Sequence, residues 1–337
     1  MSEEKNKMKI SVAVITYNQE DTIAQTLDSI LMQQGDFDLE LIIGEDCSTD
    51  NTLTICKQYA EKYSDKVKLF SGPKNLGITA NYFRTLKACT GEFIGDISGD
   101  DYYCDDHALE KQLQYMQAHP DVGVMGANGY RYYVKRDEMI AGLNPVCEAV
   151  ANEAKEFYFS PSYPGGVYFK PVGTMLRRTV LDYIDFDEII RRDLPVEDYP
   201  MQAIWSQYTK FACLPDLMVV YRIYKESATF IPIDHPKYLS YHKGLVNIRR
   251  YLNELFPTDI CFSEQWLQEY EFYKEFLLYV HQRDYNMAKS LIANQSTLIE
   301  HSPKMHQARR FTKTWFRFVL FHYYKDYTSR KFVRNLR

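Results

Sequence analysis

The chain has 337 residues, of which 45% are hydrophobic and 25% are charged, and its formal net charge is −5. This length and composition fit an ordinary globular protein with one large domain or two smaller ones, and they exclude a largely disordered chain. The acidic balance argues against a nucleic-acid-binding protein, which normally needs a basic surface.

The chain opens with the charged segment MSEEKNKMKI and goes directly into a strand pattern. It therefore predicts neither a signal peptide nor an initial membrane anchor, and no later apolar run has the length of a membrane-spanning helix. The seven cysteines are odd in number, scattered, and form no C-x-x-C pair. They are expected to be reduced thiols in a cytoplasmic protein.

Strand and helix patterns alternate over about the first 130 residues. The run ISVAVITYN is typical of a strand, and the segment after it forms one apolar helical face from Ile23, Leu27, Ile30 and Leu31. Further strands are predicted in LELIIGED, KVKLFSG, EFIGDI and VGVMGA, with helices in STDNTLTICKQYAEKY, TANYFRTLKACT and HALEKQLQYMQAH. This alternation predicts parallel β-α-β units in an α/β fold, with the ligand beyond the carboxyl ends of the strands.

Beyond this part the pattern becomes mixed. Breaks at glycine, proline and serine prevent an assignment from Tyr130 to about Tyr168, and VGTMLRRTVLDYI then indicates a strand that enters a helix. Glu197 and Asp198 open a further helix, where carboxylates suit the helix dipole, and FACLPDLMVVYRIY returns as a strand. The pattern after about residue 235 is helical. We therefore predict one domain over residues 1–234 and a helical region over residues 235–337.

Polar residues gather where the predicted strands end. They are Thr16, Tyr17 and Asn18 after the first strand, Glu45 and Asp46 after the second, and Asp100 and Asp101 after the fourth. The turn TYNQEDT lacks the glycine-rich fingerprint of a dinucleotide site, and the sequence has neither a P-loop nor a G-x-S-x-G elbow. An α/β protein without a glycine cradle needs another device for anionic ligands, and a divalent metal held by carboxylates is the usual one.

Several segments, in the same order, resemble those of a known family. They are VAVITYNQEDTIAQTLDSI, LELIIGEDCSTDNT, NLGITANYF, GEFIGDISGDDYYCDDHALEKQL, and VEDYP followed by VVYRIYKESAT. Together they resemble the family 2 glycosyltransferases, whose nucleotide-sugar-binding fold is called GT-A, over roughly residues 8 to 230. The resemblance implies a GT-A catalytic domain with a mostly parallel, mixed sheet flanked by helices, followed by a helical C-terminal region.

The resemblance implies a nucleotide-binding role for the residues at the first two strand ends. In that family these positions hold the nucleotide base, which places Thr16, Tyr17, Asn18 and Asp46 at the donor nucleotide. A carboxylate that accepts a ring N–H is a sound way to select among bases.

The acidic pair after the fourth strand resembles the D-x-D motif of the family, which contacts the ribose and a Mg²⁺ or Mn²⁺ ion on the diphosphate. By position, Asp100 takes the ribose and metal roles and Asp101 the metal role. Two positions depart from the family pattern. The first acid of the common motif is Ser98 here, and many members have histidine where this chain has Tyr224.

Glu197 and Asp198 resemble the E-D pair of inverting members, in which the Asp is the catalytic base. The acceptor hydroxyl must lose a proton as it attacks the anomeric carbon, and a positioned carboxylate can take that proton. The transition state is expected to be oxocarbenium-like. Glu197 and Arg222 are candidates to contact the diphosphate or the acceptor.

Simpler roles remain open for several residues. Asp105 and Asp106 are expected to be the N-cap and first-turn acids of the next helix. His235 and His242 are expected to be surface histidines, because a seven-residue gap makes no standard metal pair. Arg222 is equally well explained by a surface ion pair.

The sequence thus predicts an inverting glycosyltransferase that moves a sugar from a nucleotide-diphospho-sugar, first of all a UDP-sugar, to a hydroxyl of a glycan or glycolipid. Family members that build bacterial surface polysaccharides do the same. Two alternatives stay open. One is a catalytically silent nucleotide-sugar-binding protein, suggested by Ser98 and Tyr224; the other is a nucleotidyltransferase, which would normally carry a glycine-rich, basic loop that TYNQEDT lacks.

The last segment, from Pro303 to Arg337, is rich in Lys, Arg and aromatic residues and carries almost no acid. It predicts either a peripheral contact with anionic membrane near a membrane-held acceptor, or helices that pack on the catalytic domain with their cations in water.

Overall fold

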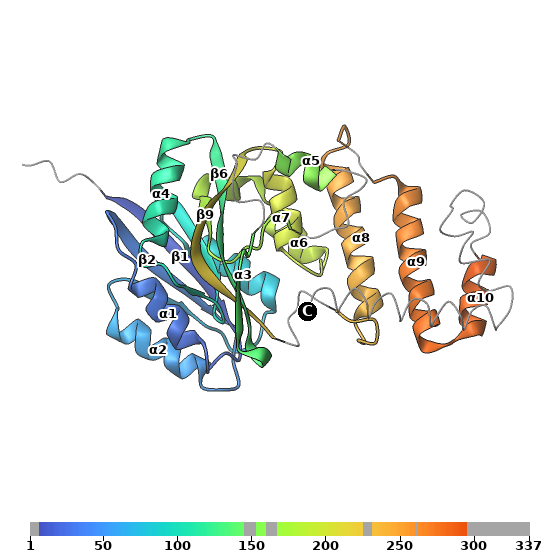
Figure 1. Cartoon of the computed structure of the whole chain (residues 1–337), viewed down its shortest axis with the longest axis horizontal. Coiled ribbons are helices and arrows are strands. Elements are labelled where there is room, and N and C mark those ends of the chain that lie inside the picture. The colour runs from blue at the N-terminus through green and yellow to red at the C-terminus, as the bar shows by residue number, and fades with distance from the viewer. Residues whose placement is uncertain (1–6, 145–152, 160–166, 225–230, 260–261, 295–337) are drawn as a thin grey trace, which may run out of the picture. The chain divides into compact units, whose positions relative to one another are not determined.

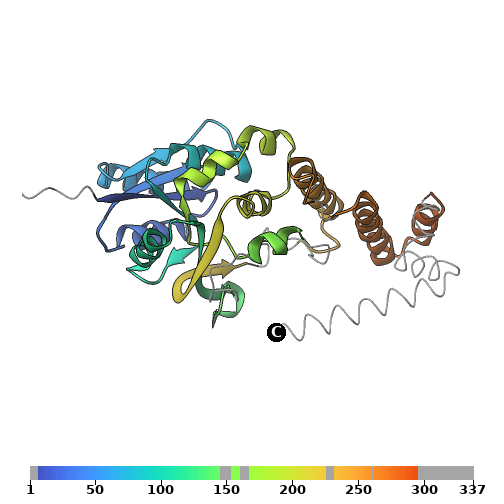
Figure 2. The same cartoon turned by 90° about the horizontal axis from the view of Figure 1, so that it is seen from above.

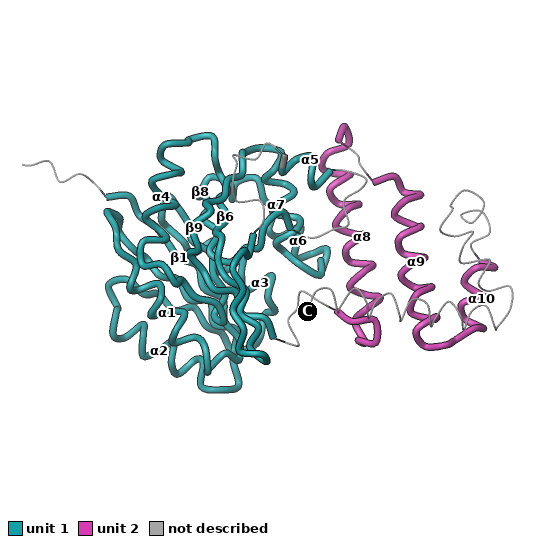
Figure 3. The backbone as a smooth tube through the Cα atoms, viewed as in Figure 1, with its two compact units in different colours: residues 1–227 teal, residues 228–337 magenta. Residues whose placement is uncertain are grey.

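The computed structural model describes residues 7–144, 153–159, 167–224, 231–259 and 262–294 (Figure 1). The chain divides into two compact units, Met1–Ser227 and Ala228–Arg337, which Figure 3 shows in two colours. The first unit contains the sheet, and the described part of the second is helical.

The first unit begins with strands and helices that alternate as the sequence pattern predicts. In chain order they are β1 (Met8–Thr16), α1 (Ile23–Leu31), β2 (Phe37–Glu45), α2 (Thr52–Lys62), β3 (Val67–Phe70), α3 (Ile78–Ala88), β4 (Phe93–Ser98), α4 (Ala108–Ala118) and β6 (Val122–Tyr133). A two-residue strand that the pattern did not indicate, β5 (Tyr102–Tyr103), follows the acidic turn.

The rest of the first unit adds the elements that complete the sheet. They are β7 (Glu138–Ala141), α5 (Glu153–Phe159), β8 (Thr174–Arg177), α6 (Phe186–Arg191), α7 (Asp198–Trp205) and β9 (Lys210–Ile223). The helix predicted after β8 is a 3₁₀ helix, Arg178–Tyr183. The carbonyl of Val180 in this segment accepts the indole N–H of Trp205, 2.9 Å away, so a tertiary contact supplies the partner for that carbonyl.

The strands form one mixed sheet in the order β3-β2-β1-β4-β8-β6-β9-β5, with β7 paired to β6. Strands β3, β2, β1 and β4 run parallel, β8 is antiparallel to both β4 and β6, and β6 and β9 run parallel over a long ladder. The parallel order places the carboxyl ends of β1, β2 and β4 at one edge. The predicted α/β fold with a mostly parallel, mixed sheet and flanking helices is confirmed.

The two faces of the sheet carry different helices (Figures 1 and 2). One face packs its apolar residues, among them Val12 and Ile97, against α1, α2 and α4. Ile23, Leu27 and Ile30 of α1 are fully buried there, as predicted, and Leu31 is partly buried. Side chains alternate along a strand, so the residues of β4 on either side of Ile97 face α3 instead.

The second unit contains α8 (Tyr238–Leu255), α9 (Glu264–Gln282) and α10 (Tyr285–Asn294). No helix in the described part of the chain combines the length and the apolar character needed to cross a membrane. His235 is exposed, as expected. The prediction of a surface position is wrong for His242, which is half-buried: its Nδ1 lies 3.0 Å from the Tyr270 hydroxyl, and its ring contacts that of Tyr238 edge-on.

The cysteines do not all match the expectation of reduced thiols. Cys47, Cys56, Cys89 and Cys104 are free, but Cys213 in β9 is disulfide-bonded. The expectation is therefore wrong for Cys213. The two other cysteines, at positions 147 and 261, lie outside the described residues.

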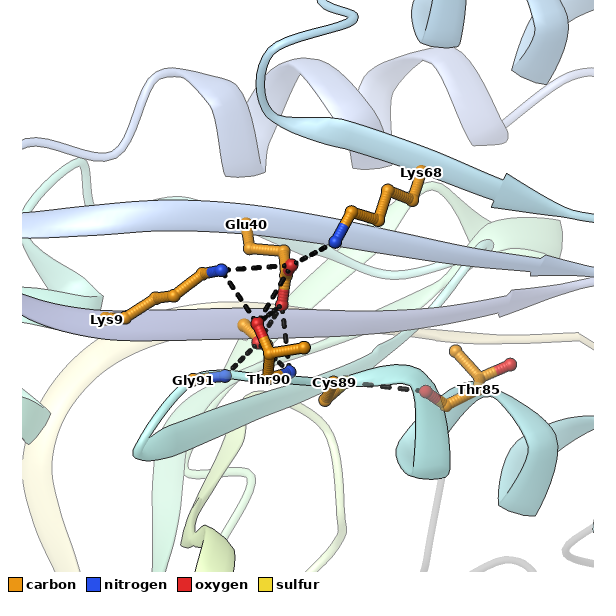
Figure 4. Close-up of polar contacts among 8 residues, drawn as sticks. Lys9, Glu40, Lys68, Thr85, Cys89, Thr90 and Gly91 are labelled. Atoms are coloured by element: carbon orange, nitrogen blue, oxygen red, sulfur yellow. Dashed lines mark hydrogen bonds and ion pairs between the residues drawn. The ribbon is translucent and has the colours of Figure 1, made fainter.

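A buried ionic network links β1, β2 and β3 with the segment before β4 (Figure 4). Glu40 of β2 is 3% exposed, and its Oε1 lies 3.1 Å from the ammonium of Lys9 and 2.8 Å from that of Lys68. The hydroxyl of Ser11 and the backbone N–H of Thr90 donate to Oε2. Burial would raise the pKa of Glu40, but the hydrogen bonds from Lys68, Ser11, Thr90 and Lys9 outweigh it and hold the pKa at about 2.

Glu40→Gln is expected to lower the free energy of unfolding by about 1–3 kcal/mol at pH 7, because the charged acceptor of these donors is lost. The folded-state pKa lies below the unfolded-state value, so this stabilisation is present above about pH 4.5 and is lost as the pH falls toward 2. Urea unfolding of wild type and variant between pH 2 and 7 measures the gap. Glu61→Gln, at an exposed position on α2, is the control. A gap that stayed constant down to pH 2 would contradict the prediction.

Candidate active site

The acidic turn between β4 and β5, which contains Asp100 and Asp101, is held in place by contacts with β9. Asp101 is 1% exposed, and its Oδ1 accepts the backbone N–H of Arg222 at 2.8 Å. Its carbonyl oxygen accepts the hydroxyl of Thr26 in α1 at 2.6 Å. Strands β5 and β9 pair at this point, where Tyr102 lies opposite Val220. The protein's own contacts therefore fix the position of Asp101.

Arg222 is buried beneath this turn. One guanidinium nitrogen donates to the carbonyl oxygen of Asp100 and another to the side-chain oxygen of Gln25. Its guanidinium carbon lies 4.7 Å from the centre of the Tyr102 ring. Arg222 is 8% exposed, so the alternative of a surface ion pair is wrong.

The charges of the turn are not balanced by its own cation. Burial raises the pKa of Asp101 well above its usual range, the neighbouring Asp100 raises it further, and Arg222 opposes both effects. Burial also raises the pKa of Asp100. The guanidinium of Arg222 donates to neutral oxygens, so no hydrogen bond from it neutralises either carboxylate. Two hard oxygen ligands in a negative, partly dry turn fit Mg²⁺ or Mn²⁺.

A second acidic cluster lies just after the turn. Ligand atoms of Asp105, Asp106 and His107 lie within 4.8 Å of one another. Asp105, however, accepts the backbone N–H of His107 and pairs with Lys111 at 2.6 Å, and Asp106 lies 2.8 Å from the His107 ring. The prediction of an N-cap and a first-turn acid is wrong in position, because His107 is the N-cap of α4 and both acids precede it. Their contacts are those of helix-start acids.

At the end of β1, Tyr17 exposes its ring, whereas the side chains of Thr16 and Asn18 form hydrogen bonds within the protein. Tyr17 is 45% exposed, whereas Thr16 is 3% exposed and its hydroxyl donates to the side chain of Gln19. Asn18 has a positive φ of 52°, and its side-chain oxygen accepts the backbone N–H of Thr49 at 2.8 Å. Asn18 thus ties two loops together, and of the three it is Tyr17 that offers a free surface to a nucleotide base.

Asp46 closes β2 and holds a loop. It is 4% exposed, and its two carboxylate oxygens accept the backbone N–H groups of Leu76 at 2.8 Å and Gly77 at 2.9 Å. Gly77 has a φ of 84°, a backbone conformation that favours glycine. Each carboxylate oxygen has two acceptor positions, so Asp46 keeps the capacity to accept one more N–H.

The predicted catalytic pair lies in a cavity beside the acidic turn. Glu197 is the N-cap of α7 and Asp198 is its first residue, and Asp198 accepts the backbone N–H of Tyr199 at 2.7 Å. A cavity of about 50 Å³ is lined by Ile15, Tyr82, Asp96, Ile97, Ser98, Pro171, Val172, Glu197 and Asp198. The structure thus brings Glu197 and Asp198 together with Ser98, the first residue of the acidic turn.

Sequence reasoning missed two polar side chains that line this cavity, Asp96 and Tyr82, and a cation near it, Lys170. Asp96 of β4 faces α3, and its Oδ2 accepts the hydroxyl of Tyr82 at 2.6 Å. Lys170 is near enough to Asp198 to lower its pKa against the rise caused by burial. A signal for Asp96 was present, because a carboxylate inside the apolar strand EFIGDI is unusual. No comparable signal marked Tyr82 or Lys170.

The three carboxyl groups of the cavity influence one another. Burial raises the pKa of Asp96 to about 7, with Tyr82 opposing and Asp198 reinforcing the rise. Burial and the charge of Asp198 raise the pKa of Glu197. Because like charges this close cannot all ionise, the group titrates as a unit, and at neutral pH part of it is protonated. Such a cavity can hold an ionised carboxylate as a proton acceptor beside neutral carboxylic acids.

Asp96→Asn is expected to raise stability relative to wild type as the pH increases. The folded-state pKa of Asp96 lies above its unfolded-state value, so the wild-type contribution is full below about pH 4 and is lost as the pH rises through 7. Asparagine can still accept the Tyr82 hydroxyl and does not ionise, so the variant should gain about 1–3 kcal/mol on wild type between pH 4 and 8. Thermal unfolding across this range measures the gain.

Tyr82→Phe provides the matched test of the same titration. It removes the hydrogen bond that lowers the pKa of Asp96. In this variant the loss of stability with rising pH should therefore extend to higher pH than in the wild type. A pH dependence identical in wild type, Asp96→Asn and Tyr82→Phe would show that Asp96 does not titrate in the folded protein near neutral pH.

Comparison with known proteins identifies the family. The model of the family described as glycosyl transferase family 2 matches residues 11–184, about half of the chain. An uncharacterized protein of Mycobacterium tuberculosis is 30% identical over 63% of this chain and 58% of its own length, so the chain spans little more than half of that relative. A poly(ribitol-phosphate) beta-glucosyltransferase of Bacillus spizizenii is 38% identical over 28% of this chain and 15% of its own length.

Two solved structures share the fold at 18% sequence identity. S. aureus TarS 1-349 in complex with UDP-GlcNAc aligns with a TM-score of 0.57 over 92% of this chain and 90% of its own. The mannosyltransferase PcManGT from Pyrobaculum calidifontis, in complex with GDP-Man and Mn²⁺, aligns with a TM-score of 0.53 over 94% and 86%. The chain belongs to glycosyl transferase family 2 and has the GT-A fold.

Proposed function

We propose that this chain is an inverting glycosyltransferase that moves a sugar from a UDP-sugar to a hydroxyl of a glycan or glycolipid in bacterial surface polysaccharide synthesis. One observation carries the proposal: Glu197 and Asp198 share a cavity with Ser98, at the start of the acidic turn. A proton acceptor and a turn suited to a diphosphate are thereby adjacent. The relative that glucosylates a poly(ribitol-phosphate) and the TarS complex with UDP-GlcNAc support the choice of polymer and donor.

On the donor side, the exposed ring of Tyr17 would stack on the base, and the spare acceptor positions of Asp46 would receive its ring N–H. Asp100 would bind the ribose. Thr16 and Asn18 would act indirectly, because the hydroxyl of Thr16 and the amide of Asn18 hold neighbouring loops in place. The resulting pocket binds and orients the nucleotide.

On the diphosphate side, Asp100 and Asp101 would hold a Mg²⁺ or Mn²⁺ ion. The bound ion would offset the negative charge that develops on the leaving nucleoside diphosphate. Arg222 would contribute through the turn, because its side chain and backbone fix the positions of Asp100 and Asp101. Ser98 supplies no charged ligand, so the metal would rest on the last two acids of the turn. The Mn²⁺ in the mannosyltransferase structure supports a metal in this fold.

At the acceptor, Asp198 would take the proton of the attacking hydroxyl while the sugar bond to the diphosphate breaks on the opposite face, which inverts the anomeric carbon. Lys170 favours the ionised form of Asp198. Glu197, whose pKa burial and Asp198 raise, would remain protonated and contact the acceptor. The cavity would therefore keep one charged base beside neutral carboxylic acids.

The deciding experiment measures release of nucleoside diphosphate from UDP-, GDP- and dTDP-sugars, each with Mn²⁺ and with chelator. The proposal expects metal-dependent release from a UDP-sugar, which rises when lipid-linked or polymeric acceptor extract is added. A silent nucleotide-sugar-binding protein would bind UDP-sugar by calorimetry without release under any condition. A nucleotidyltransferase would instead form a nucleotide-sugar and pyrophosphate from a sugar phosphate and a nucleoside triphosphate.

The proposed location is cytoplasmic, at the inner face of a membrane that carries the acceptor. The C-terminal segment on which a peripheral contact with anionic lipid depends lies outside the described residues. Co-sedimentation of the full chain with anionic and with neutral vesicles tests that contact.

A further inference from the structure

Two adjacent arginines on α8 have opposite surroundings. Arg250 pairs with Glu264 at 2.7 Å and with Glu271 at 3.4 Å, both on α9. Arg249 is 0% exposed, and none of its three guanidinium nitrogens makes a hydrogen bond. No ion pair reaches it from any part of the chain that the structure describes. Arg250 thus has two carboxylate partners, whereas the buried N–H donors of Arg249 have no hydrogen-bond acceptor.

Aromatic rings enclose Arg249. Its guanidinium carbon lies 4.9 Å from the ring centre of Phe262, 4.8 Å from that of Trp266 and 5.1 Å from that of Tyr270. Trp266 and Tyr270 lie four residues apart on α9, and Phe262 just before the helix extends this row of rings, which faces α8. The faces of the guanidinium are therefore covered by rings. The Tyr270 hydroxyl lies near enough for Arg249 to oppose the rise that burial causes in the pKa of Tyr270, but no acceptor meets the N–H edges in hydrogen-bond geometry.

The same row continues to a second cation. Lys274 lies four residues after Tyr270, and its ammonium is 5.2 Å from the Tyr270 ring centre. His242, on the α8 side, bonds the Tyr270 hydroxyl. Burial, Lys274 and Arg249 lower the pKa of His242 to about 4, and burial and Arg249 lower that of Lys274. Basic groups thus meet around Tyr270, and no carboxylate of the described residues pairs with either Arg249 or Lys274.

This arrangement is costly for the isolated chain. A buried charge without a partner is strongly unfavourable, and each buried donor without an acceptor costs about 1–3 kcal/mol. Cation–π contacts recover about 0.5–2 kcal/mol each. They offset part of the charge and none of the missing hydrogen bonds. An anion that accepts from the guanidinium edge would supply what is missing.

We propose that Arg249, Lys274 and Tyr270 form an oxyanion site between α8 and α9 that takes a phosphate group. Phosphate suits the site better than a carboxylate for two reasons. It carries up to two charges to match two cations, and its several oxygens can meet the planar arginine fork and the lysine ammonium together. Lys274 and His242 are half-buried, so the anion reaches the site from their side. The site does not depend on the sugar-transfer reaction.

Inorganic phosphate is the probe, added to the full chain at constant ionic strength with chloride as the reference. Trp266 borders the site, so tryptophan emission should change in a saturable way with phosphate, and Trp266→Phe should remove the change. Arg249→Met should weaken the phosphate affinity at least about tenfold, the usual loss for a charge-assisted hydrogen bond. Lys274→Met should weaken it less, because Lys274 is closer to solvent.

Arg250→Met is the matched control, because it removes the same charge from the next position of the same helix. It should leave the phosphate affinity unchanged while lowering stability, because it breaks two ion pairs. Arg249→Met should instead be no less stable than wild type in phosphate-free buffer. Absence of a saturable wild-type response, or an equal loss of affinity in both variants, would overturn the proposal. The wild-type titration alone decides the matter if Arg249→Met does not fold.

The phosphate group could belong to a soluble compound or to a lipid headgroup, and a second set of arms separates these sources. Glycerol phosphate tests the soluble form. Vesicles of phosphatidylcholine with and without phosphatidic acid test the lipid form, read as the difference between wild type and Arg249→Met, because basic surface residues contribute equally to both. If wild type and Arg249→Met differ only in binding to phosphatidic acid vesicles, the ligand is a lipid headgroup. If glycerol phosphate binds and the two proteins bind the vesicles equally, the ligand is a soluble phosphate.

Discussion

Asp198→Asn is expected to reduce sugar transfer by about 10²–10⁴-fold while leaving donor binding nearly unchanged, because it removes the proton acceptor and keeps the side-chain shape. The remaining amide oxygen can still accept the Tyr199 N–H that positions residue 198. The loss should therefore appear in kcat rather than in KM for the donor. Initial-rate kinetics with the donor identified by diphosphate release, together with calorimetric donor binding, measure both quantities.

Two further variants separate this role from a plain helix-start role. Asp185→Asn removes the charge from the N-cap of α6, where the side chain accepts the Glu188 N–H at 2.9 Å; because asparagine caps a helix about as well as aspartate, it should change stability little and leave kcat unchanged. Glu197→Gln should lower kcat much less than Asp198→Asn. If Glu197→Gln proved the more damaging of the two, the base would be Glu197. If Asp198→Asn behaved like Asp185→Asn, neither the base nor the inverting mechanism proposed above would stand.

The sequence predicted local elements well because their signals are local. The strands and helices up to β6 follow from periodic apolar residues and short turns. Tertiary packing does not alter the elements that these patterns predict. The contacts that complete the site are long-range. Asp101 and Arg222 meet across 121 positions, through the two-residue strand β5, which is too short to leave a periodic signal. The Tyr82–Asp96 bond likewise depends on which face of β4 meets α3.

The same reasoning explains the errors. Pattern alone placed His242 at the surface, because the row of rings on α9 that covers it lies in another helix. Arg249 drew no attention for the same reason, since its burial depends on Phe262 and Trp266. The free thiols were inferred from spacing, but Cys213 is disulfide-bonded, and the proximity that a disulfide needs comes from the tertiary fold and not from spacing.

Ser98 stands where the family motif commonly has its first acid, and the structure places another acid, Asp96, beside it. Asp96 and Ser98 lie two residues apart on β4, so their side chains share one face of the strand and line the same cavity. An acid at position 98 would add a fourth carboxyl group to the three already there and raise their pKa values further. With serine at position 98, this face of β4 carries one carboxyl group, Asp96, next to the proposed base, and the face adds no acid to the turn. The proposed metal therefore depends more heavily on Asp100 and Asp101.

Asp101→Asn is expected to reduce metal-dependent diphosphate release by about 10²–10³-fold, because a metal that stabilises a developing charge contributes several kcal/mol. The amide oxygen can still accept the Arg222 N–H, so the turn should keep its fold, which thermal unfolding checks. The Mn²⁺ concentration for half-maximal release should rise strongly, and donor binding should lose its dependence on Mn²⁺.

Asp106→Asn is the matched control for Asp101→Asn, because Asp106 belongs to the half-buried cluster with Asp105 and His107, whose ligand atoms are close enough together to hold an ion. Asp105 and Asp106 are already engaged with Lys111 and His107, so this variant should leave the Mn²⁺ dependence unchanged. The reverse result, with Mn²⁺ dependence lost in Asp106→Asn and kept in Asp101→Asn, would move the metal to that cluster. Burial separates the two places: Asp101 is 1% exposed, and a carboxylate that dry needs a cation far more than one in contact with water and a lysine.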